Sequence, residues 1–460
     1  MSTVVSPCVP TPSGRLRHGL RMRLLAAGLW LFGAQAHAAD LLQAFRDAME
    51  NDASFAAARA ALKAGREKLP QGYAGLLPTI TGSGNSNWNR GQLDYRAPST
   101  STGPRVFNAN GWSVTLTQPV YRPQNWATYQ QAEFQVAQAE AVFSQAAQDL
   151  ITRVAQAYFD VLASQDSLAL VGAQKTAIAE QLEQAKRNFE VGTATITDTH
   201  EAQARYDLSS AQEIAAQNDL EIKKRALQLI IGKFPETLTP LRASLQLRPP
   251  QPAVMEQWVD SAQNSSFAVR IQDAAMAVAQ REIERQRAGH LPTLDLVGTR
   301  SYLGTGGGTT SVSAYDYNNN LIALQLSVPL YAGGVVNSRV REAQANLDKA
   351  RADLENSKRQ AALTARQSFL GVTNGMAQVR ALEQALLSSE TALSSNRLGY
   401  EVGVRINIDV LNSQQQVFST KRDLSKARYD TIVNGLKLKA VAGALSAADL
   451  EEVNALLGSN

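Results

Sequence analysis

Two stretches of the chain repeat apolar residues every seven positions over far more residues than an ordinary globular helix contains. The first covers residues 120–189, has no proline after Pro123, and as a helix would be on the order of 100 Å long. The second covers residues 336–400. A seven-residue period of this length predicts supercoiling against partner helices. The repeated positions include Val154, Val161, Leu168, Leu182 and Phe189, then Val372, Val379, Leu386, Leu393 and Tyr400.

Four short segments instead alternate between apolar and polar residues, which is typical of strands with one apolar and one wet face. In the second of them, Trp112 and Val114 alternate with Ser113 and Thr115. Polar segments rich in Gly, Ser and Thr, residues 89–109 and 303–320, predict a loop between the members of each strand pair. The predicted strands are residues 79–88, 111–119, 293–302 and 321–328.

Each long helix ends in a short motif that appears twice. Residues 189–198 read FEVGTATITD and residues 400–409 read YEVGVRINID, so that Ile196 falls on Asn407. Glycine after a helical run supplies the left-handed residue that ends a helix, which predicts this conformation for Gly192 and Gly403. Aspartate before the next apolar run predicts N-caps for two return helices. We call residues 189–198 the first tip and residues 400–409 the second tip. The predicted caps are Asp198 and Asp409, and the return helices are residues 198–231 and 409–442.

The order helix, strand, loop, strand, long helix, tip, helix occurs twice in the chain. Residues 40–71 and 255–288 predict the helix that opens each copy, and TLTQPVY at Thr115 recurs as QLSVPLY at Gln325, 210 residues later. A repeat of this length indicates an internal duplication. The predicted organisation is a first repeat at 39–247, a Pro-rich linker at 248–252, and a second repeat with a C-terminal equatorial segment at 253–460.

The first 38 residues have the form of a secretory signal peptide, with basic residues, an apolar core and a small-residue exit. A short core helix is the alternative interpretation. Met22 is a possible start of translation. The single cysteine, Cys8, lies in this segment, so the exported chain would have no disulfide. The signal features are Arg21 and Arg23, residues 24–32, and Ala36-His37-Ala38.

Composition argues against an enzyme and against a nucleic-acid partner. The 460 residues carry a formal net charge of only +4 and are only 6% aromatic. The histidines of the exported chain, His200 and His290, are far apart, and no metal-ligand spacing is present. Residues 306–308, three glycines, lie between two predicted strands and are not followed by Lys-Ser/Thr, so they are not a phosphate loop. No cofactor is expected.

Four strands are too few to close a barrel, and an open sheet edge is not viable in lipid. If the strands lie in a membrane, the chain must therefore oligomerise, with eight strands in a dimer and twelve in a trimer. The polar strand faces would then line a lumen. The alternative is a soluble coiled-coil protein without a pore, such as a periplasmic adaptor, although an adaptor would lack the duplicated strand pairs.

Three long segments make the chain similar to the TolC family of outer-membrane channel-tunnels over essentially the whole exported sequence. This resemblance implies a mixed α+β membrane protein. As a homotrimer it would form a twelve-stranded outer-membrane β-barrel that is continued by a long α-helical coiled-coil barrel. It also implies an exit duct for type I secretion or efflux in a Gram-negative cell, docked by a periplasmic adaptor and an inner-membrane ABC or proton-driven transporter. The segments are AYFDVLASQDSLALVGAQKTAIAEQLEQAKRNFEVGTATITD (157–198), YEVGVRINIDVLNSQQQVF (400–418) and KARYDTIVNGLKLKAVAGALSAADL (426–450).

The same resemblance implies a gate latch at the tips. Tyr400 and Arg405 match the residues that tie an inner coiled coil to an outer one, and Thr197 and Asp198 match their partners. An Arg–Asp link is charge-assisted. When exposed it is worth only about 0–1 kcal/mol, which suits a latch that must open. Plain cap, turn and core positions are the alternative for these residues.

A constriction ring is implied at the start of the second return helix. Asp409 would form a ring of carboxylates in a trimer and favour cations. The family's best-known member has a second Asp one turn later, where this chain has Asn412, so a single ring with weaker cation selectivity is expected. Gly192 and Gly403 would mark the partner-docking turns.

Overall fold

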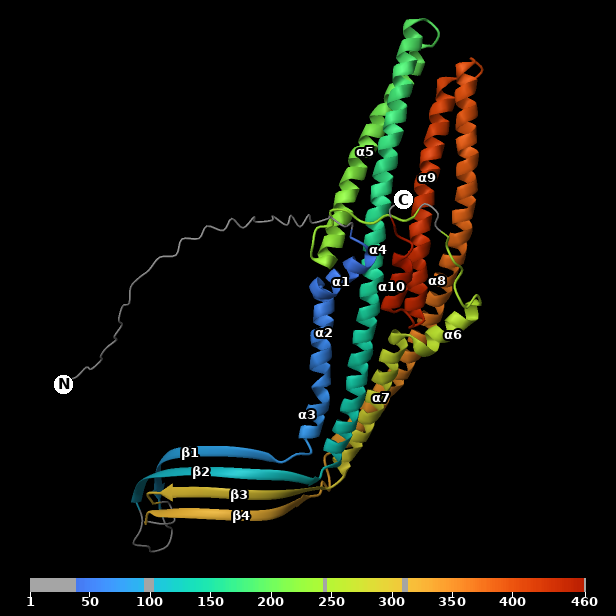
Figure 1. The fold of residues 1–460 in the computed structure, drawn as a ribbon. Coiled ribbons are helices and arrows are strands. Elements are labelled where there is room, and N and C mark those ends of the chain that lie inside the picture. The colour runs from blue at the N-terminus through green and yellow to red at the C-terminus, as the bar shows by residue number, and fades with distance from the viewer. Residues whose placement is uncertain (1–38, 95–102, 243–245, 308–312, 459–460) are drawn as a thin grey trace, which may run out of the picture. The chain divides into compact units, whose positions relative to one another are not determined.

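A computed structural model describes residues 39–94, 103–242, 246–307 and 313–458. The predicted signal peptide, with Cys8 and Met22, lies outside the described residues. Figure 1 shows the order of the elements. The first half contains α1 (Leu41–Asn51), α2 (Ala53–Arg66), α3 (Lys68–Ala74), β1 (Thr79–Leu93), β2 (Gly103–Tyr121), α4 (Pro123–Glu190) and α5 (Ile196–Ile231). The second contains α6 (Met255–Ser265), α7 (Phe267–Arg287), the 3-10 helix η1 (Ala288–His290), β3 (Thr293–Thr305), β4 (Tyr315–Ser327), α8 (Val335–Glu401), α9 (Asn407–Val441) and α10 (Ala447–Asn454).

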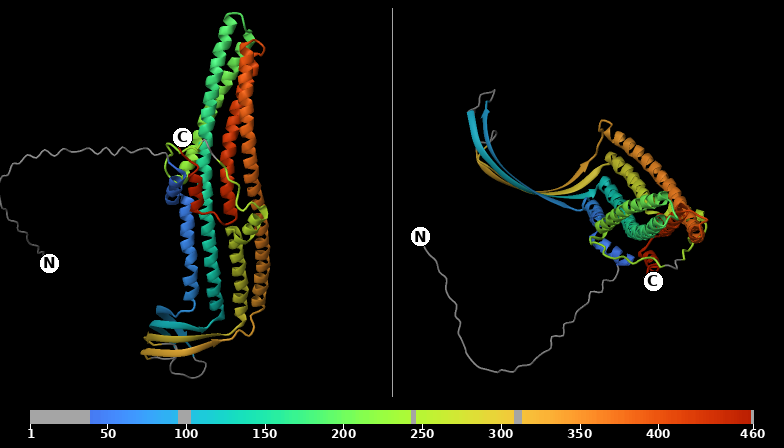
Figure 2. Two further views of the ribbon diagram at one scale, coloured as in Figure 1. Left: turned by 45° about the vertical axis from the view of Figure 1, so that its right-hand side comes forward. Right: turned by 90° about the horizontal axis from the view of Figure 1, so that it is seen from above.

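The four strands form one antiparallel sheet in the order β1-β2-β3-β4, and Figure 2 shows that they curve together. β2 and β3 pair the two repeats, with Thr115 opposite Thr299. The strands are longer than predicted. The predicted loops 89–109 and 303–320 are wrong at both ends, because β1 and β2 pair out to Leu93 and Gly103, and β3 and β4 pair out to Thr305 and Tyr315. Backbone hydrogen bonds carry a ladder on through residues whose side chains give no strand signal.

The alternation in the sequence sorts the sheet into two chemically different faces. Hydroxyl groups line one face, where the Oγ atoms of Ser83 and Ser113 are 2.8 Å apart and the Oγ1 atoms of Thr115 and Thr299 are 3.2 Å apart. The opposite face is apolar and exposed in the single chain. Its exposed members include Ile80, Trp112, Val114, Leu116, Ile322, Leu324 and Leu326.

The two predicted long helices are present as α4, with 68 residues, and α8, with 67. α5 returns along α4 and α9 returns along α8 (Figure 1). α7 packs against both α4 and α8 (Figure 2). The hydroxyl of Ser261 in α6 donates to the carbonyl of Ala442 at 3.2 Å. This hydrogen bond joins α6 to the C-terminal end of α9. None of the helices in the described ranges is long and apolar enough to cross a membrane.

The largest hydrophobic cluster lies around the middle of α4, where Val154, Tyr158 and Phe159 are almost fully buried. α1, α5, α9 and α10 all contribute to it. Tyr158 donates from its hydroxyl to the carbonyls of Ala39 and Thr239, at 3.0 and 2.9 Å, and so ties the ends of the first repeat to this core. A buried hydroxyl that finds such partners avoids the desolvation penalty of an unmade hydrogen bond.

The two predicted opening helices are each interrupted by a side chain that acts as an N-cap, and the first is interrupted again at Glu67, which forms no side-chain cap. Residues 40–71 break at Asp52, whose carboxylate accepts from the Phe55 amide at 2.6 Å and also pairs with Arg153 of α4. Residues 255–288 break at Ser266, whose hydroxyl accepts from the Val269 amide at 3.3 Å. Asp and Ser compete with the helix for backbone groups, which is why the predicted continuous helices are wrong at these positions.

Candidate functional site

The two tips have the same backbone geometry. Gly192 has φ +78° and Gly403 has φ +77°. In the first tip the amides of the next two residues donate to the carbonyl of Asn188, at 2.8 and 3.2 Å. In the second tip the corresponding amides donate to the carbonyl of Gly399, at 2.8 and 3.0 Å. This is the Schellman arrangement, in which a left-handed residue ends a helix. The left-handed conformation predicted for both glycines is therefore confirmed.

The predicted N-caps are wrong by three residues. α5 is capped by Thr195, whose hydroxyl accepts from the Asp198 amide at 3.3 Å, while Oδ2 of Asp198 accepts from the Thr195 amide at 3.0 Å. This reciprocal capping box places Asp198 in the first turn of α5. Asp409 holds the same position in α9, after Ile406 as the capping residue. Both carboxylates thus lie where the helix dipole favours negative charge.

The predicted latch residues are only partly brought together. Nη1 of Arg405 lies 3.5 Å from Oδ2 of Asp409, one helical turn further along. Gly399 makes room for this side chain, because a Cβ there would lie 2.7 Å from Cγ of Arg405. In the described residues Arg405 makes no ion pair with Asp198, whose Oδ2 is occupied in the capping box, and Thr197 is exposed. The latch role of these residues stays a prediction.

Side-chain hydrogen bonds near the tips tie the α4–α5 hairpin to the α8–α9 hairpin. Nδ2 of Asn188 donates to the hydroxyl of Tyr400 at 3.1 Å. Nε2 of Gln181 donates to Oδ1 of Asn407 at 2.6 Å, and these two residues are 7% and 1% exposed. Nδ2 of Asn407 also points to the carbonyl of Asp198 at 3.5 Å. Neither Gln181 nor Asn407 was predicted as a site residue. A signal was present, because Asn407 replaces the apolar Ile196 between otherwise matching tips.

A further contact between the hairpins involves a predicted site residue. Arg205 of α5 donates from Nη2 to Oδ1 of Asn412 on α9 at 2.9 Å, and from Nη1 to Oε1 of Gln415. Asn412 therefore lies one turn after Asp409, as expected, but it is held by Arg205, which was not predicted as a site residue. Charged hydrogen bonds of this kind are shorter and stronger than neutral ones.

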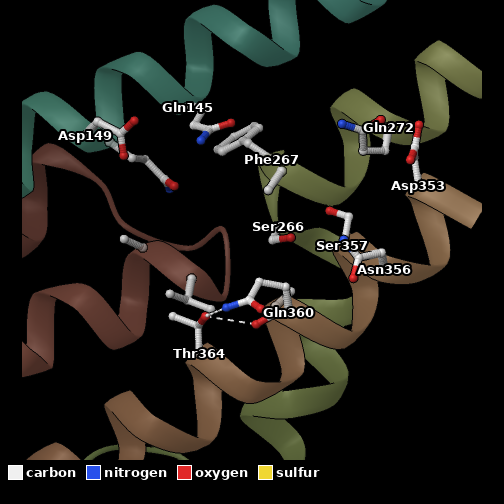
Figure 3. A pocket seen from close by; sticks show the side chains of 15 residues that line it. Gln145, Asp149, Ser266, Phe267, Gln272, Asp353, Asn356, Ser357, Gln360 and Thr364 are labelled. Atoms are coloured by element: carbon white, nitrogen blue, oxygen red, sulfur yellow. Dashed lines mark hydrogen bonds between the residues drawn. The ribbon is translucent and has the colours of Figure 1, made fainter. Parts of the chain in front are cut away.

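A cavity of about 630 Å³ lies away from the tips, where α9 ends and α7 begins. Figure 3 shows Asp149 of α4, Phe267 of α7 and Asp353 of α8 around it. Gln360 and Thr364 are joined by a hydrogen bond of 3.4 Å, drawn as a dashed line. Most of the residues that line it carry amide, hydroxyl or carboxylate side chains. The cavity is thus a polar junction at which α7 takes the place of α9 between α4 and α8.

Comparisons with known proteins cover nearly the whole described chain. A family model described as outer membrane efflux protein matches residues 44–233 and 258–444. The alkaline protease secretion protein AprF of Pseudomonas aeruginosa is 33% identical over 443 residues, covering 93% of this chain and 90% of AprF. The outer membrane protein TolC of Vibrio cholerae is 32% identical, covering 94% of this chain and 97% of that protein.

Solved structures share the fold at lower sequence identity. The outer membrane protein VceC of Vibrio cholerae has a TM-score of 0.75 at 18% identity, covering 88% of this chain and 96% of VceC. The Campylobacter jejuni CmeC outer membrane channel has a TM-score of 0.76 at 16% identity, covering 91% and 90%. The helices and the antiparallel sheet described above are therefore arranged as in these proteins.

Proposed function

The chain belongs to the outer membrane efflux protein family, and from this premise we propose that it is the outer-membrane exit duct of a tripartite export system. The family resemblance expected from the sequence is confirmed by the family match and by relatives about one-third identical over most of the chain. AprF is a protease secretion protein by name, so secreted protein is one class of cargo that fits, and small molecules are the other. Such a duct extends from the Gram-negative outer membrane into the periplasm.

One observation carries this proposal: the single sheet has an exposed apolar face and a hydroxyl-lined face. An apolar face of this kind is stable against lipid, and a hydroxyl-lined face is stable against water. β1 and β4 are edge strands with unpaired backbone groups, which lipid does not tolerate. Three copies that pair β4 of one with β1 of the next would remove all edges and form a twelve-stranded barrel.

The helical region supports the same homotrimer. α5 carries exposed apolar side chains, among them Leu208, Ile222 and Leu229, the last 82% exposed. α8 carries three leucines whose side chains are also exposed, Leu363, Leu370 and Leu387. Contact between α5 of one copy and α8 of the next would bury both sets, and the hydrophobic gain is roughly 25 cal/mol for each Å² of apolar surface.

The partners of the duct would dock at the tips. A periplasmic adaptor and an inner-membrane ABC or proton-driven transporter would contact the turns at Gly192 and Gly403, where α4 and α8 end. The transporter would supply the energy, so the chain needs no catalytic step and no cofactor of its own. The small net charge of +4 gives no reason to add a nucleic acid to these partners.

Gating at the tips is part of the proposal. Tyr400, Arg405, Thr197 and Asp198 would restrain the α8–α9 hairpin, and Asp409 would form the carboxylate ring. The bond between Asn188 and Tyr400 supports a restraint at this place. Arg405→Ser is expected to raise single-channel conductance by freeing the second tip. Asp409→Asn is expected to lower the preference for cations.

The experiment that tests the proposal is single-channel recording of the purified mature protein in a planar lipid bilayer, with its native mass measured in detergent. We expect a small conductance from a particle of three times the mature chain mass. A monomer would contradict the shared barrel. Folded, lipid-inserted protein without conductance would favour the alternative of a coiled-coil adaptor without a pore.

A further inference from the structure

Arg205 is a cation held in place by neutral groups. Its guanidinium donates to the side-chain oxygens of Asn412 and Gln415, both of which are uncharged amides. In the described part of the chain it takes part in no ion pair. Asn412 and Gln415 therefore orient the guanidinium without offsetting its charge.

The nearest predicted functional group is the carboxylate of Asp409, three residues before Asn412 on α9. Three residues of helix rise about 4.5 Å, so Asn412, which holds the Arg205 guanidinium at 2.9 Å, follows Asp409 by less than one turn. Exposed charges interact over a screening length of about 10 Å at 0.1 M salt. Asp409 is also paired with Arg405, at 3.5 Å. The start of α9 thus brings two guanidinium groups, those of Arg405 and Arg205, to the side of the Asp409 carboxylate, while Asp198 in the first turn of α5 adds a second carboxylate beside Asn407.

We propose that Arg205 is a specificity-determining residue of the tip aperture, where its charge offsets the Asp409 carboxylate and makes the aperture tolerant of anions. This rests on the proposed function, which places the start of α9 at the aperture. An aspartate at position 412 would have cancelled the charge of Arg205. Asn412 keeps the hydrogen bond with Arg205 but carries no charge, so the positive charge of Arg205 is not neutralised. The aperture therefore accepts anionic ions and cargo that a purely acidic ring would repel.

The test is the reversal potential of single channels in a KCl gradient at about 0.1 M salt, where exposed charges are only partly screened. In water, two unit charges about 7 Å apart change a partition ratio about threefold. Arg205→Gln, which removes the charge and retains a hydrogen-bonding amide, should therefore raise the cation-to-anion permeability ratio about threefold or more. Asn412→Asp should raise it by a similar factor, because it neutralises Arg205 without deleting it. Both increases should shrink at 1 M KCl.

Arg225→Gln is the matched control. Arg225 lies on the same helix, about 30 Å further along, and is paired with Glu221 at 2.8 Å, so the ratio should not change. An unchanged ratio in both Arg205→Gln and Asn412→Asp, with normal conductance and trimer mass, would overturn the inference and leave the proposed function intact. An equal change in Arg225→Gln would overturn it too, since any lost cation would then suffice. If the unmodified protein forms no pore, the proposed function itself fails.

Discussion

The ion pair between Arg122 and Asp295 joins the two repeats where the sheet meets the helices. Arg122 lies between β2 and α4, and it donates from Nε and Nη2 to the two carboxylate oxygens of Asp295 on β3, at 2.8 and 2.6 Å. The side chain of Asp295 is 8% exposed, whereas that of Arg122 is 41% exposed. This difference predicts that replacing Arg122 and replacing Asp295 lower the free energy of unfolding by different amounts.

Arg122→Met leaves the Asp295 carboxylate buried without its counter-charge. Removing one partner of a fully buried pair costs about 3–5 kcal/mol, and the half-exposed arginine places this case at the low end, about 3 kcal/mol. Asp295→Asn keeps one hydrogen-bond acceptor and leaves an arginine that can turn to water, so we expect a loss of only about 1–2 kcal/mol. The double variant should lose less than the sum of the two, because the buried charge is then absent.

The assay is denaturant unfolding of the folded protein in detergent, followed by tryptophan fluorescence, with Trp126 close to the pair in sequence. A lower midpoint at constant slope reports a loss of stability. Arg359→Met is the control. Arg359 pairs with Glu355 and both side chains are exposed, so losing this pair should lower the free energy of unfolding by less than about 1 kcal/mol. The reasoning is refuted if Asp295→Asn destabilises the protein as much as Arg122→Met.

Three further changes test other contacts. Asn407→Ala removes the buried hydrogen bond between the hairpins and should raise single-channel conductance; a conductance equal to that of the unmodified protein would show that this bond does not restrain the tip. Hydrogen bonds from Arg285 lower the pKa of Glu282 below its ordinary value of 4.5, so their stabilisation is present above that pH and is lost as pH falls through the folded pKa. Glu282→Gln should thus be less stable than the unmodified protein at pH 7, and the difference should shrink as pH falls below 4.5 through the folded pKa; a constant difference in unfolding midpoint would contradict this. Gly443→Ala forces a side chain onto a residue with φ +72° and against the backbone of α6, so it should cost at least about 1–2 kcal/mol. Gly435→Ala, in the interior of α9 with open space around it, should be neutral or stabilising, and the denaturant unfolding assay described above measures both glycine variants.

Local features of the fold could be predicted from the sequence because they depend on neighbouring residues alone. The heptad spacing identified α4 and α8, and alternation identified the two faces of the sheet. The left-handed turns at Gly192 and Gly403 followed from one residue each, because only glycine adopts this conformation without strain. The residue that caps α5 could not be predicted as well, because Thr195 and Asp198 are both good N-cap residues. The reciprocal hydrogen bonds of the capping box make Thr195 the cap and place Asp198 in the first turn.

What the tertiary structure alone decided are contacts between segments far apart in the chain. The break at Asp52 is stabilised by Arg153, 101 residues later, and the strands extend past their apolar residues because a partner backbone is present. Gln181 meets Asn407, and Arg205 meets Asn412, over separations of 226 and 207 residues. Their meeting depends on the axial register of two hairpins. That register is set by packing summed over many side chains, so no short stretch of sequence specifies it.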